Sequence, residues 1–453
     1  MVRIPEYRCV FALADILRNI EKLLSARYVI LGAGLAGLSA AYHLEKDNLI
    51  FERNNHVGGL CYSEEIQGFL LDYCVHVLYH KDPQIRKLCE DLLGDNFKDH
   101  VRSTWIYSKG VFTQYPFQAN LYGLPLDVVE ECIVGFIDAK YSNGRQFENK
   151  NFADWIMNTF GGGIAKHFMF PFNEKLWTVH PRKMSTEWVE GFVPQPEIED
   201  ILDGALPGQK RLFGYNAYFR YPIHGGIKEL AVALSKKLSN IHLEREAVSI
   251  DPKKKIVYFA DCSEPAHYDV LISTLPLKYF PRMIEGVPND VLNICDKLIH
   301  NSVECINVAI NRPVDMTRHW IYYPEPGFPF YRIMLPHTMS EGMVPAGKGA
   351  FSVEVSHGND RPVNLAQIEE DVIDGLRQAE LLARNENPIF IKRLSVPVAY
   401  PIYTEERPDA IKTIKKYLKE NDIYSIGRFG NWEYSNMEKA LKDGRDLALE
   451  LGN

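Results

Sequence analysis

The sequence predicts an α/β protein built around a discontinuous Rossmann-type domain, because three features follow one another in the order that this fold requires. Residues 27–31 (RYVIL) form a short apolar run typical of a buried strand, and the glycine-rich turn GAGLAG follows at once. A helix of small and aliphatic residues comes next, and a second strand, NLIFE, ends in Glu52. An acid about 20 residues after the first glycine is typical of a dinucleotide-binding unit.

Each residue of this pattern has its own mechanical role. Gly32 permits the tight turn, Gly34 removes a side chain where a pyrophosphate approaches the backbone, and Gly37 lets the helix lie close to the strand. The N-terminus of the helix offers N–H groups and the positive end of the helix dipole to phosphates. Glu52 can accept hydrogen bonds from ribose hydroxyls. We therefore expect these four residues to bind a dinucleotide.

A second glycine pair favours FAD over NAD. Gly58 and Gly59 follow Glu52 closely, and Leu60 and a polar strand come after them. NAD-binding domains do not need this second turn, whereas flavoproteins of the glutathione-reductase type use it to wrap the ribityl–pyrophosphate part of FAD. The sequence therefore predicts non-covalently bound FAD.

The FAD-binding domain of this class is interrupted by other domains, and its later segments can be recognised. Residues 222–238 predict a glycine turn and a helix, residues 268–277 a buried strand, and residues 424–430 a strand running into another glycine turn. In these segments and the stretches that adjoin them, the residues expected to contact the cofactor are Val248, Thr274, Gly427 and Met437.

We expect four parts along the chain. Apolar residues at helical spacing predict a helical extension over residues 1–27. The FAD-binding domain is expected over residues 28–90, 218–280 and 396–453. Residues 91–217 have mainly helical patterns and predict a helical substrate domain. Residues 281–395 alternate between polar and apolar positions and predict an antiparallel sheet substrate domain.

Composition and charge exclude several classes of protein. A net charge of −8 argues against a general binder of nucleic acid or of anionic membranes, although it leaves room for a local basic pocket. No apolar run reaches the length of a transmembrane segment. The eight cysteines are scattered, without zinc-binding spacing, so no metal site is expected. This distribution also predicts that the thiols are reduced and that the protein is cytoplasmic.

Segments outside the glycine turns resemble one family, the UDP-galactopyranose mutases, particularly those of eukaryotic type. The resemblance runs in the same order along the chain from residue 28 to the end. The segments that carry it are YPFQAN (115–120), GGGIAKHFMFPFNEKLWTVHPRKMSTEW (161–188), NAYFRYP (216–222), HWIYYPEPGFPFYR (319–332), AYPIYT (399–404) and GRFGNWEY (427–434).

The resemblance implies an isomerase in which the flavin is a covalent catalyst. In such mutases N5 of the reduced flavin attacks the anomeric carbon and displaces the nucleotide diphosphate. The ring then opens and recloses as a furanose, without net electron transfer. The substrate implied is a nucleotide sugar, and the role implied is biosynthesis of cell-surface polysaccharide. The reductant, NAD(P)H or another donor, and the formation of an oligomer stay open.

The resemblance also assigns roles to single residues. Arg332 is implied as the clamp of the substrate diphosphate, a role that suits the bidentate guanidinium, and the alternative for this arginine is a surface ion pair. Arg428 and His76 are implied beside the flavin. The remaining substrate-binding residues implied are Tyr400 and Tyr434 for the diphosphate, Tyr115 and Gln118 for the uridine, and Asn173, Trp177, Asn216, Trp320 and Tyr322 for the sugar side.

Several positions depart from the family pattern. Cys74 and Val75 replace a glycine pair before His76, and Phe192 stands where the family has a second diphosphate-binding arginine. Phe170 also replaces a residue that is commonly basic. Arg182 or Lys183 could substitute for the missing charge if the loop shifts. The alternative function is therefore an FAD-dependent oxidoreductase of the amine oxidase or protoporphyrinogen oxidase type, whose pockets are often apolar. A third hypothesis is a flavin-binding protein without turnover.

Overall fold

The computed structural model describes residues 24–44, 47–141, 148–208, 211–214 and 216–452. The chain divides into two compact units. Among the described residues, the first unit comprises those within 24–59, 231–297 and 409–452, and the second comprises those within 60–230 and 298–408. Most of the predicted N-terminal helical extension, residues 1–23, lies outside the described residues.

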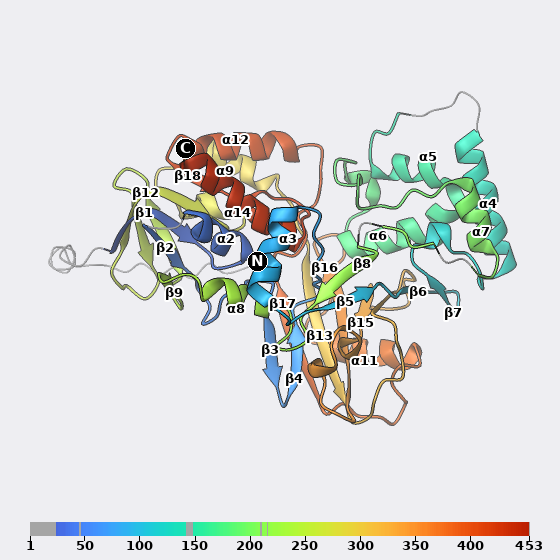
Figure 1. Ribbon diagram of the computed structural model, residues 1–453. Coiled ribbons are helices and arrows are strands. Elements are labelled where there is room, and N and C mark those ends of the chain that lie inside the picture. The colour runs from blue at the N-terminus through green and yellow to red at the C-terminus, as the bar shows by residue number, and fades with distance from the viewer. Residues whose placement is uncertain (1–23, 45–46, 142–147, 209–210, 215, 453) are drawn as a thin grey trace. The chain divides into compact units, whose positions relative to one another are not determined.

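The first unit is built on a seven-stranded sheet whose central strands are parallel (Figure 1). The pairs β1–β2, β1–β12, β2–β9 and β12–β18 are parallel, whereas β10 and β11 form an antiparallel edge. The strands are, in spatial order, β10 (Ala247–Asp251), β11 (Ile256–Phe259), β12 (Ala266–Ser273), β1 (Leu24–Leu31), β2 (Asn48–Phe51) and β9 (Ile241–His242), with β18 (Ile423–Ser425) paired to β12.

Strand β1 begins earlier than the sequence pattern predicts. Leu24 lies opposite Ala266, and Ala26 lies opposite Tyr268, so residues 24–26 extend the strand instead of ending a helix. The apolar spacing that includes Leu24 fits both a helix and a strand, and here pairing with β12 decides between them. The helical prediction was therefore wrong for residues 24–26, whereas the predicted strand 27–31 is part of β1.

Helices of the first unit pack directly on the glycine turn. A Cβ atom on Gly444 in α14 would lie 2.4 Å from the carbonyl oxygen of Ala36 in α2, so the two helices touch through their backbones. Ser39 Oγ of α2 also donates to the Leu441 carbonyl over 2.6 Å. The helices of this unit are α2 (Leu35–Leu44), η4 (Phe280–Met283), α9 (Asn289–Asp296), α13 (Gly427–Gly430) and α14 (Met437–Gly452), with α8 (Glu229–Ser235) and α12 (Arg407–Lys419) at the junctions with the second unit.

The second unit also contains a seven-stranded sheet, which is antiparallel except for the parallel pair β14–β6. The sheet takes β6 and β7 from the segment whose pattern is mainly helical. The strands are, in spatial order, β17 (Phe390–Val396), β13 (Ser302–Ile310), β16 (Gly349–His357), β15 (Arg332–Met334), β14 (Trp320–Tyr322), β6 (Thr104–Ser108) and β7 (Val111–Gln114). Two small antiparallel pairs accompany the sheet, β3 (Ser63–Ile66) with β4 (Phe69–Asp72) and β5 (Lys98–Val101) with β8 (Tyr218–Tyr221).

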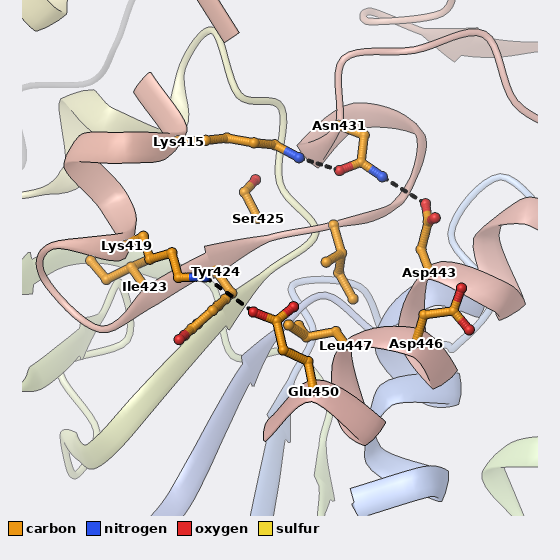
Figure 2. Close-up of a pocket in the computed structure, with 11 residues that line it drawn as sticks. Lys415, Lys419, Ile423, Tyr424, Ser425, Asn431, Asp443, Asp446, Leu447 and Glu450 are labelled. Carbon is orange, nitrogen blue, oxygen red and sulfur yellow. Dashed lines mark hydrogen bonds and ion pairs between the residues drawn. The ribbon is translucent and has the colours of Figure 1, made fainter. Parts of the chain in front are cut away.

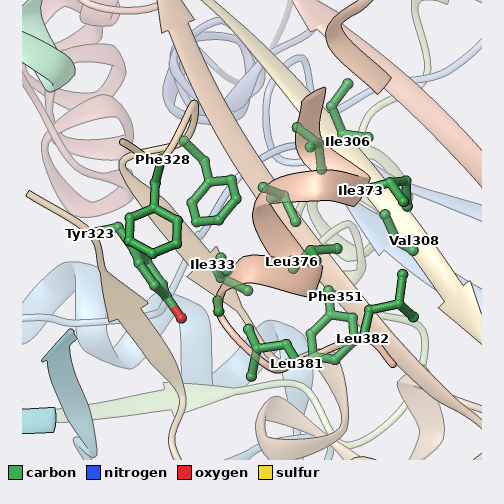
Figure 3. Packing of buried hydrophobic residues seen from close by; sticks show 14 of the residues in the cluster. Ile306, Val308, Tyr323, Phe328, Ile333, Phe351, Ile373, Leu376, Leu381 and Leu382 are labelled. Carbon is green, nitrogen blue, oxygen red and sulfur yellow. The ribbon is translucent and has the colours of Figure 1, made fainter. Parts of the chain in front are cut away.

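One face of this sheet is covered by α11, and a buried hydrophobic cluster lies between them (Figure 3). Ile373 and Leu376 of α11 pack with Ile306, Val308 and Phe351 of the sheet. Because β16 is buried on both of its faces, even its polar side chains lie inside the protein.

The helical part of the second unit is held by close backbone contact. A Cβ on Gly161 would lie 1.9 Å from the Gly135 carbonyl oxygen, so α4 and α5 can meet only because these positions lack side chains. The helices are α3 (Pro83–Leu93), η1 (Phe117–Ala119), α4 (Leu126–Tyr141), α5 (Phe152–Ile164), the π-helical turn η2 (Ala165–Met169), α6 (Phe170–Trp177), η3 (Pro181–Lys183), α7 (Ile198–Ala205), α10 (Pro336–Met339), η5 (Glu341–Met343) and α11 (Ile368–Gln378).

Within the described part of the chain, no helix is both long and apolar enough for a membrane span.

Candidate active site

The first glycine turn has the close contacts that its sequence predicts. Gly32 has a φ of 100°, and a Cβ there would lie 2.2 Å from Thr274 Oγ1. A Cβ on Gly37 would lie 2.0 Å from the Gly32 carbonyl oxygen. These two glycines are therefore required by the protein's own packing.

Gly34 differs from its neighbours because its side-chain direction is open. No described atom lies within 4 Å of the place that a Cβ would occupy. Gly34 forms a bridge with Gly58, whose N–H donates to the Ala33 carbonyl over 2.8 Å. Gly58 and Gly59 both have positive φ, so the second turn also depends on glycine. Two glycine backbones beside the N-terminus of α2 form a cradle that fits the pyrophosphate of FAD.

Glu52 is buried at the end of β2 and ties the turn together. Its carboxylate accepts from the N–H of Ala33 and from the N–H and side-chain amide of Asn54, each over 2.9 Å. A carboxylate has about four acceptor positions, so three bonds leave one for a ribose hydroxyl. The contact between Glu52 and ribose stays a prediction.

The other predicted cofactor residues lie in different surroundings. Gly427 has positive φ, and a Cβ there would lie 2.7 Å from the Ala36 side chain. Met437 is buried at the first position of α14. Val248 is 44% exposed at an irregularity of β10. Leu60 belongs to the second unit, where it packs against Val303, Val396 and Ala399.

Arg428 and Tyr434 lie together in the first unit. The guanidinium carbon of Arg428 is 5.4 Å from the centre of the Tyr434 ring, and Arg428 Nη1 donates to the Ser435 carbonyl over 2.8 Å. Their predicted partners Arg332 and Tyr400 belong to the second unit.

A pocket of about 290 Å³ in the first unit is separate from all these residues (Figure 2). It lies among α12, β18 and α14, and its polar side chains pair with one another. Lys415 bonds Asn431, Asn431 bonds Asp443 over 2.7 Å, and Lys419 pairs with Glu450 over 3.1 Å. None of the predicted site residues lines this pocket, so we do not assign it to the candidate active site.

Arg332, the predicted clamp, forms a two-point ion pair in the second unit. Its Nε is 3.0 Å from Glu354 Oε1, and its Nη2 is 2.6 Å from Oε2. Burial lowers the pKa of Arg332, but the Glu354 carboxylate outweighs burial and holds the pKa well above the ordinary value. Arg332 is therefore permanently charged and fixed in direction.

Glu354 also holds two other parts of the predicted site. Its carboxylate accepts a short bond from the Tyr331 hydroxyl and a 3.0 Å bond from the Val75 N–H. The Tyr331 hydroxyl lies 3.4 Å from that of Tyr400. One buried carboxylate thus joins the clamp, a tyrosine pair and the loop that leads to His76.

The glycine-to-cysteine departure at Cys74 keeps the backbone conformation of a glycine. Cys74 has a φ of 60°, a backbone conformation that residues other than glycine rarely adopt. Its thiol is hydrogen-bonded to Cys305. This hydrogen bond and burial raise the pKa of the Cys74 thiol well above its usual range. His76 follows, half-buried, in the same loop.

Aromatic rings and one unpredicted cation bring together three residues predicted for substrate binding. The ring centres of Tyr115 and Tyr322 are 5.6 Å apart, and those of Tyr322 and Phe172 are 5.0 Å apart. Arg102 lies over the Tyr115 ring at 4.8 Å and donates a short hydrogen bond to Asn216 Oδ1. These contacts make one continuous wall in the second unit.

Four other predicted substrate residues are buried inside the second unit. Trp177 is completely buried, and its indole N–H donates to Asn173 Oδ1 over 3.2 Å. The Asn173 amide donates to the Met169 carbonyl over 2.7 Å, and that of Gln118 donates to Pro194 over 2.8 Å. Trp320 is buried in β14. These residues support the wall in this conformation, and their contact with a sugar or uridine stays a prediction.

The structure offers little support for replacement of the missing arginine by Lys183. Lys183 is 60% exposed and pairs with Asp360 over 2.6 Å, and Arg182 is also exposed. Phe192 is half-buried, and the Phe170 ring lies 5.8 Å from that of His180. Replacement of the missing arginine by Arg182 or Lys183 stays a prediction.

Two charged residues at this site escaped the sequence analysis: Arg102 and Glu354. Arg102 would be read as a surface residue, because nothing in its neighbouring sequence shows burial. For Glu354 a weak signal exists, since the run FSVEVSH belongs to a central strand of the sheet.

Known proteins share this fold over nearly the whole chain. Residues 30–92 match the family model of the NAD(P)-binding Rossmann-like domain. The chain is 21% identical to protoporphyrinogen oxidase 2, chloroplastic/mitochondrial, of Arabidopsis thaliana, over 93% of this chain and 92% of that protein. A solved structure of a putative protoporphyrinogen oxidase from Exiguobacterium sp. 255-15 matches with a TM-score of 0.72 at 15% identity, covering 95% of this chain and 99% of that one.

A crystal structure of reduced UDP-galactopyranose mutase is considerably more similar. The TM-score is 0.90 and the identity 30%, over 95% of this chain and 94% of the mutase chain. The chain belongs to the UDP-galactopyranose mutase-like flavoproteins. This membership confirms the family resemblance and the α/β fold class, and it supports a flavin cofactor in the glycine cradle of the first unit.

Proposed function

We propose that this mutase-like flavoprotein is an FAD-dependent sugar mutase that contracts a nucleotide-linked pyranose to the furanose. The observation that carries the proposal is the state of Arg332. Glu354 holds Nε and Nη2 of the guanidinium, while Nη1 makes no hydrogen bond with the described residues. A fixed cation with one edge left for an anion suits a substrate diphosphate.

The chain's own residues would bind and orient the substrate. Reduced FAD, when bound, supplies the nucleophile for the anomeric carbon. Arg332 would neutralise charge on the diphosphate as it leaves and returns, and the Tyr400 hydroxyl, next to that of Tyr331, would donate to its oxygens. Tyr115 and Tyr322 offer flat apolar surfaces to the uridine and sugar. No protein nucleophile is required by this division of roles.

The protoporphyrinogen oxidase match over 93% of the chain favours a second candidate, an FAD-dependent oxidoreductase. That identity of 21% supports the fold more than the substrate. The Arg332 guanidinium disfavours an amine substrate, whereas a porphyrinogen, which carries carboxylates, is the substrate class of this candidate that suits the site.

A panel of nucleotide sugars tests the proposal. Purified holoprotein is reduced with dithionite and incubated with UDP-galactopyranose, UDP-galactofuranose and other UDP- and GDP-hexoses, and the products are separated by chromatography. We expect interconversion of one pyranose–furanose pair. Arg332→Ala should lose nearly all of this activity, and Arg332→Lys should restore little because an ammonium lacks the planar fork. Absence of isomerisation of every sugar, together with oxidation of an amine or a porphyrinogen, would favour the oxidoreductase.

A further inference from the structure

The second unit contains a buried ammonium that the proposed function does not use. Lys175, on α6, is 3% exposed. Its Nζ donates to the carbonyl oxygens of Tyr323 over 2.8 Å and Phe330 over 2.9 Å, and also to that of Glu325. A lysine ammonium has three N–H donors, so all three are satisfied.

All three acceptors belong to one loop, residues 323–331, which connects β14 to β15. Tyr322 and Arg332 lie directly opposite each other as the last pair of these two strands. The Tyr323 carbonyl follows Tyr322 at once, and the Phe330 carbonyl lies two residues before Arg332. Lys175 therefore joins the two ends of the loop just beyond the pair formed by Tyr322 and Arg332.

Among the described residues, the only backbone N–H that donates to any of these three carbonyls is that of Phe328, which is 3.3 Å from the Glu325 carbonyl oxygen. Tyr323, Phe328 and Phe330 turn their side chains into the buried cluster under α11, as Figure 3 shows for the first two. The loop also contains Pro324, Pro326 and Pro329, which have no N–H to donate. Buried carbonyl oxygens require donors, and Lys175 supplies them from a different element.

The same helix also contacts one member of the pair, Tyr322, through a ring. Phe172, one turn before Lys175, places its ring 5.0 Å from that of Tyr322. Helix α6 thus fixes Tyr322 through its ring and the loop through its backbone.

We propose that Lys175 is a positioning residue that sets the geometry of Tyr322 and Arg332 for binding of an anionic nucleotide. This inference rests on the proposed function, because it takes Arg332 as the diphosphate clamp. Without the ammonium, the loop loses its three-point attachment. The first residue of β15, Arg332, is then held less firmly, and its guanidinium can move.

Charge on Lys175 gives this role a pH dependence. Burial and Arg361 lower the pKa of Lys175 to about 7, whereas Glu325 acts to raise it. The three carbonyls favour the ammonium, because the neutral amine has only two N–H donors. Lys175 is thus charged below its pKa and loses one attachment as pH rises above it. Ligand affinity should fall over the same range.

The test combines UDP binding with hydrogen exchange of residues 320–334. The holoprotein, Lys175→Met and Lys175→Arg are titrated with UDP by calorimetry from pH 6 to pH 9. Lys166→Met serves as the control, because Lys166 is an exposed lysine paired with Glu131. We expect Lys175→Met to bind UDP about 10 to 100-fold more weakly, as misplacement of a binding group does. The native affinity should fall above pH 7, whereas Lys175→Arg, which keeps its charge, should lack this alkaline loss.

Hydrogen exchange separates this inference from the proposed function. In Lys175→Met, the backbone amides of residues 320–334 should exchange faster than in the native protein. Flavin content and the thermal unfolding midpoint report whether the variant folds. A folded Lys175→Met with native exchange and native UDP affinity overturns the inference. Faster exchange in a protein that binds no UDP in any form supports the loop attachment and overturns the proposed uridine nucleotide instead. If Lys175→Met fails to fold, a native affinity that stays constant from pH 6 to pH 9 overturns the inference.

Discussion

Arg332 and Glu354 lie directly opposite each other on the adjacent strands β15 and β16, and they join through two hydrogen bonds of 3.0 and 2.6 Å. The carboxylate has no exposed surface. The pair therefore places a charged guanidinium at a defined register of the sheet, and every other feature of the candidate clamp is built on it.

Substitution of Glu354 should affect both binding and stability. Glu354→Gln keeps the shape of the side chain but leaves the Arg332 charge without its partner, at a cost of about 3 kcal/mol in the free energy of unfolding. UDP affinity should fall as well, because the guanidinium is no longer fixed. Urea unfolding and UDP calorimetry measure the two effects. A variant with native stability and affinity would show that the pair is incidental.

The departure at Phe192 predicts a gain of binding. If this position faces the diphosphate, Phe192→Arg should tighten UDP binding by about one to two decades, since a well-placed charged hydrogen bond contributes about 1.5–3 kcal/mol. Lys183→Met is the matched control and should change nothing, because Lys183 pairs with Asp360 at the surface. Weaker UDP binding by Lys183→Met would instead indicate that Lys183 replaces the missing arginine.

Substitution of Gly34 and substitution of Gly37 in the first turn should have different effects. A Cβ on Gly34 would meet no described atom within 4 Å, so Gly34→Val should fold but bind no FAD. Gly37→Val meets the Gly32 carbonyl at 2.0 Å and should lose stability whether or not FAD is present. Circular dichroism and flavin absorbance after reconstitution distinguish the two. A yellow, fully loaded Gly34→Val would place the pyrophosphate elsewhere.

Asp72 predicts a pH-dependent stability. Burial raises the pKa of this carboxyl to about 6 in the folded chain, against a usual value of 3.8, although Ser63 and Tyr221 donate to it. The folded state therefore holds this proton more tightly, and stability falls as pH rises from about 4 to about 6, by roughly 3 kcal/mol. Asp72→Asn should lack this loss, so native and variant unfolding midpoints should diverge in urea between pH 4.5 and pH 7.5. A constant difference across that range contradicts the shift.

Local patterns predicted the flavin-binding fold because its residues are fixed by short-range geometry. Gly32, Gly37 and Glu52 serve a strand, a turn and a helix that are contiguous in sequence. Their contacts in the structure match their spacing.

The supporting charges of the second unit could not be predicted in this way. Lys175 reads as an ordinary helical lysine, and only the fold reveals that a loop about 150 residues later needs its three donors. Glu354 sits in an alternating strand whose polar face would be assigned to solvent, but neighbouring strands and other parts of the unit bury both faces. Burial of a charge depends on partners distant in sequence, which no local pattern contains.

The stoichiometry of reductant against turnover tests the central claim most directly. The native holoprotein is reduced once with a single equivalent of dithionite per flavin under anaerobic conditions, and a large excess of the nucleotide sugar that it converts is added. A mutase should isomerise many equivalents of sugar with no further reductant and no oxidised product. Conversion that stops after one equivalent per flavin, or that consumes an electron acceptor mole for mole, would contradict the proposed mutase.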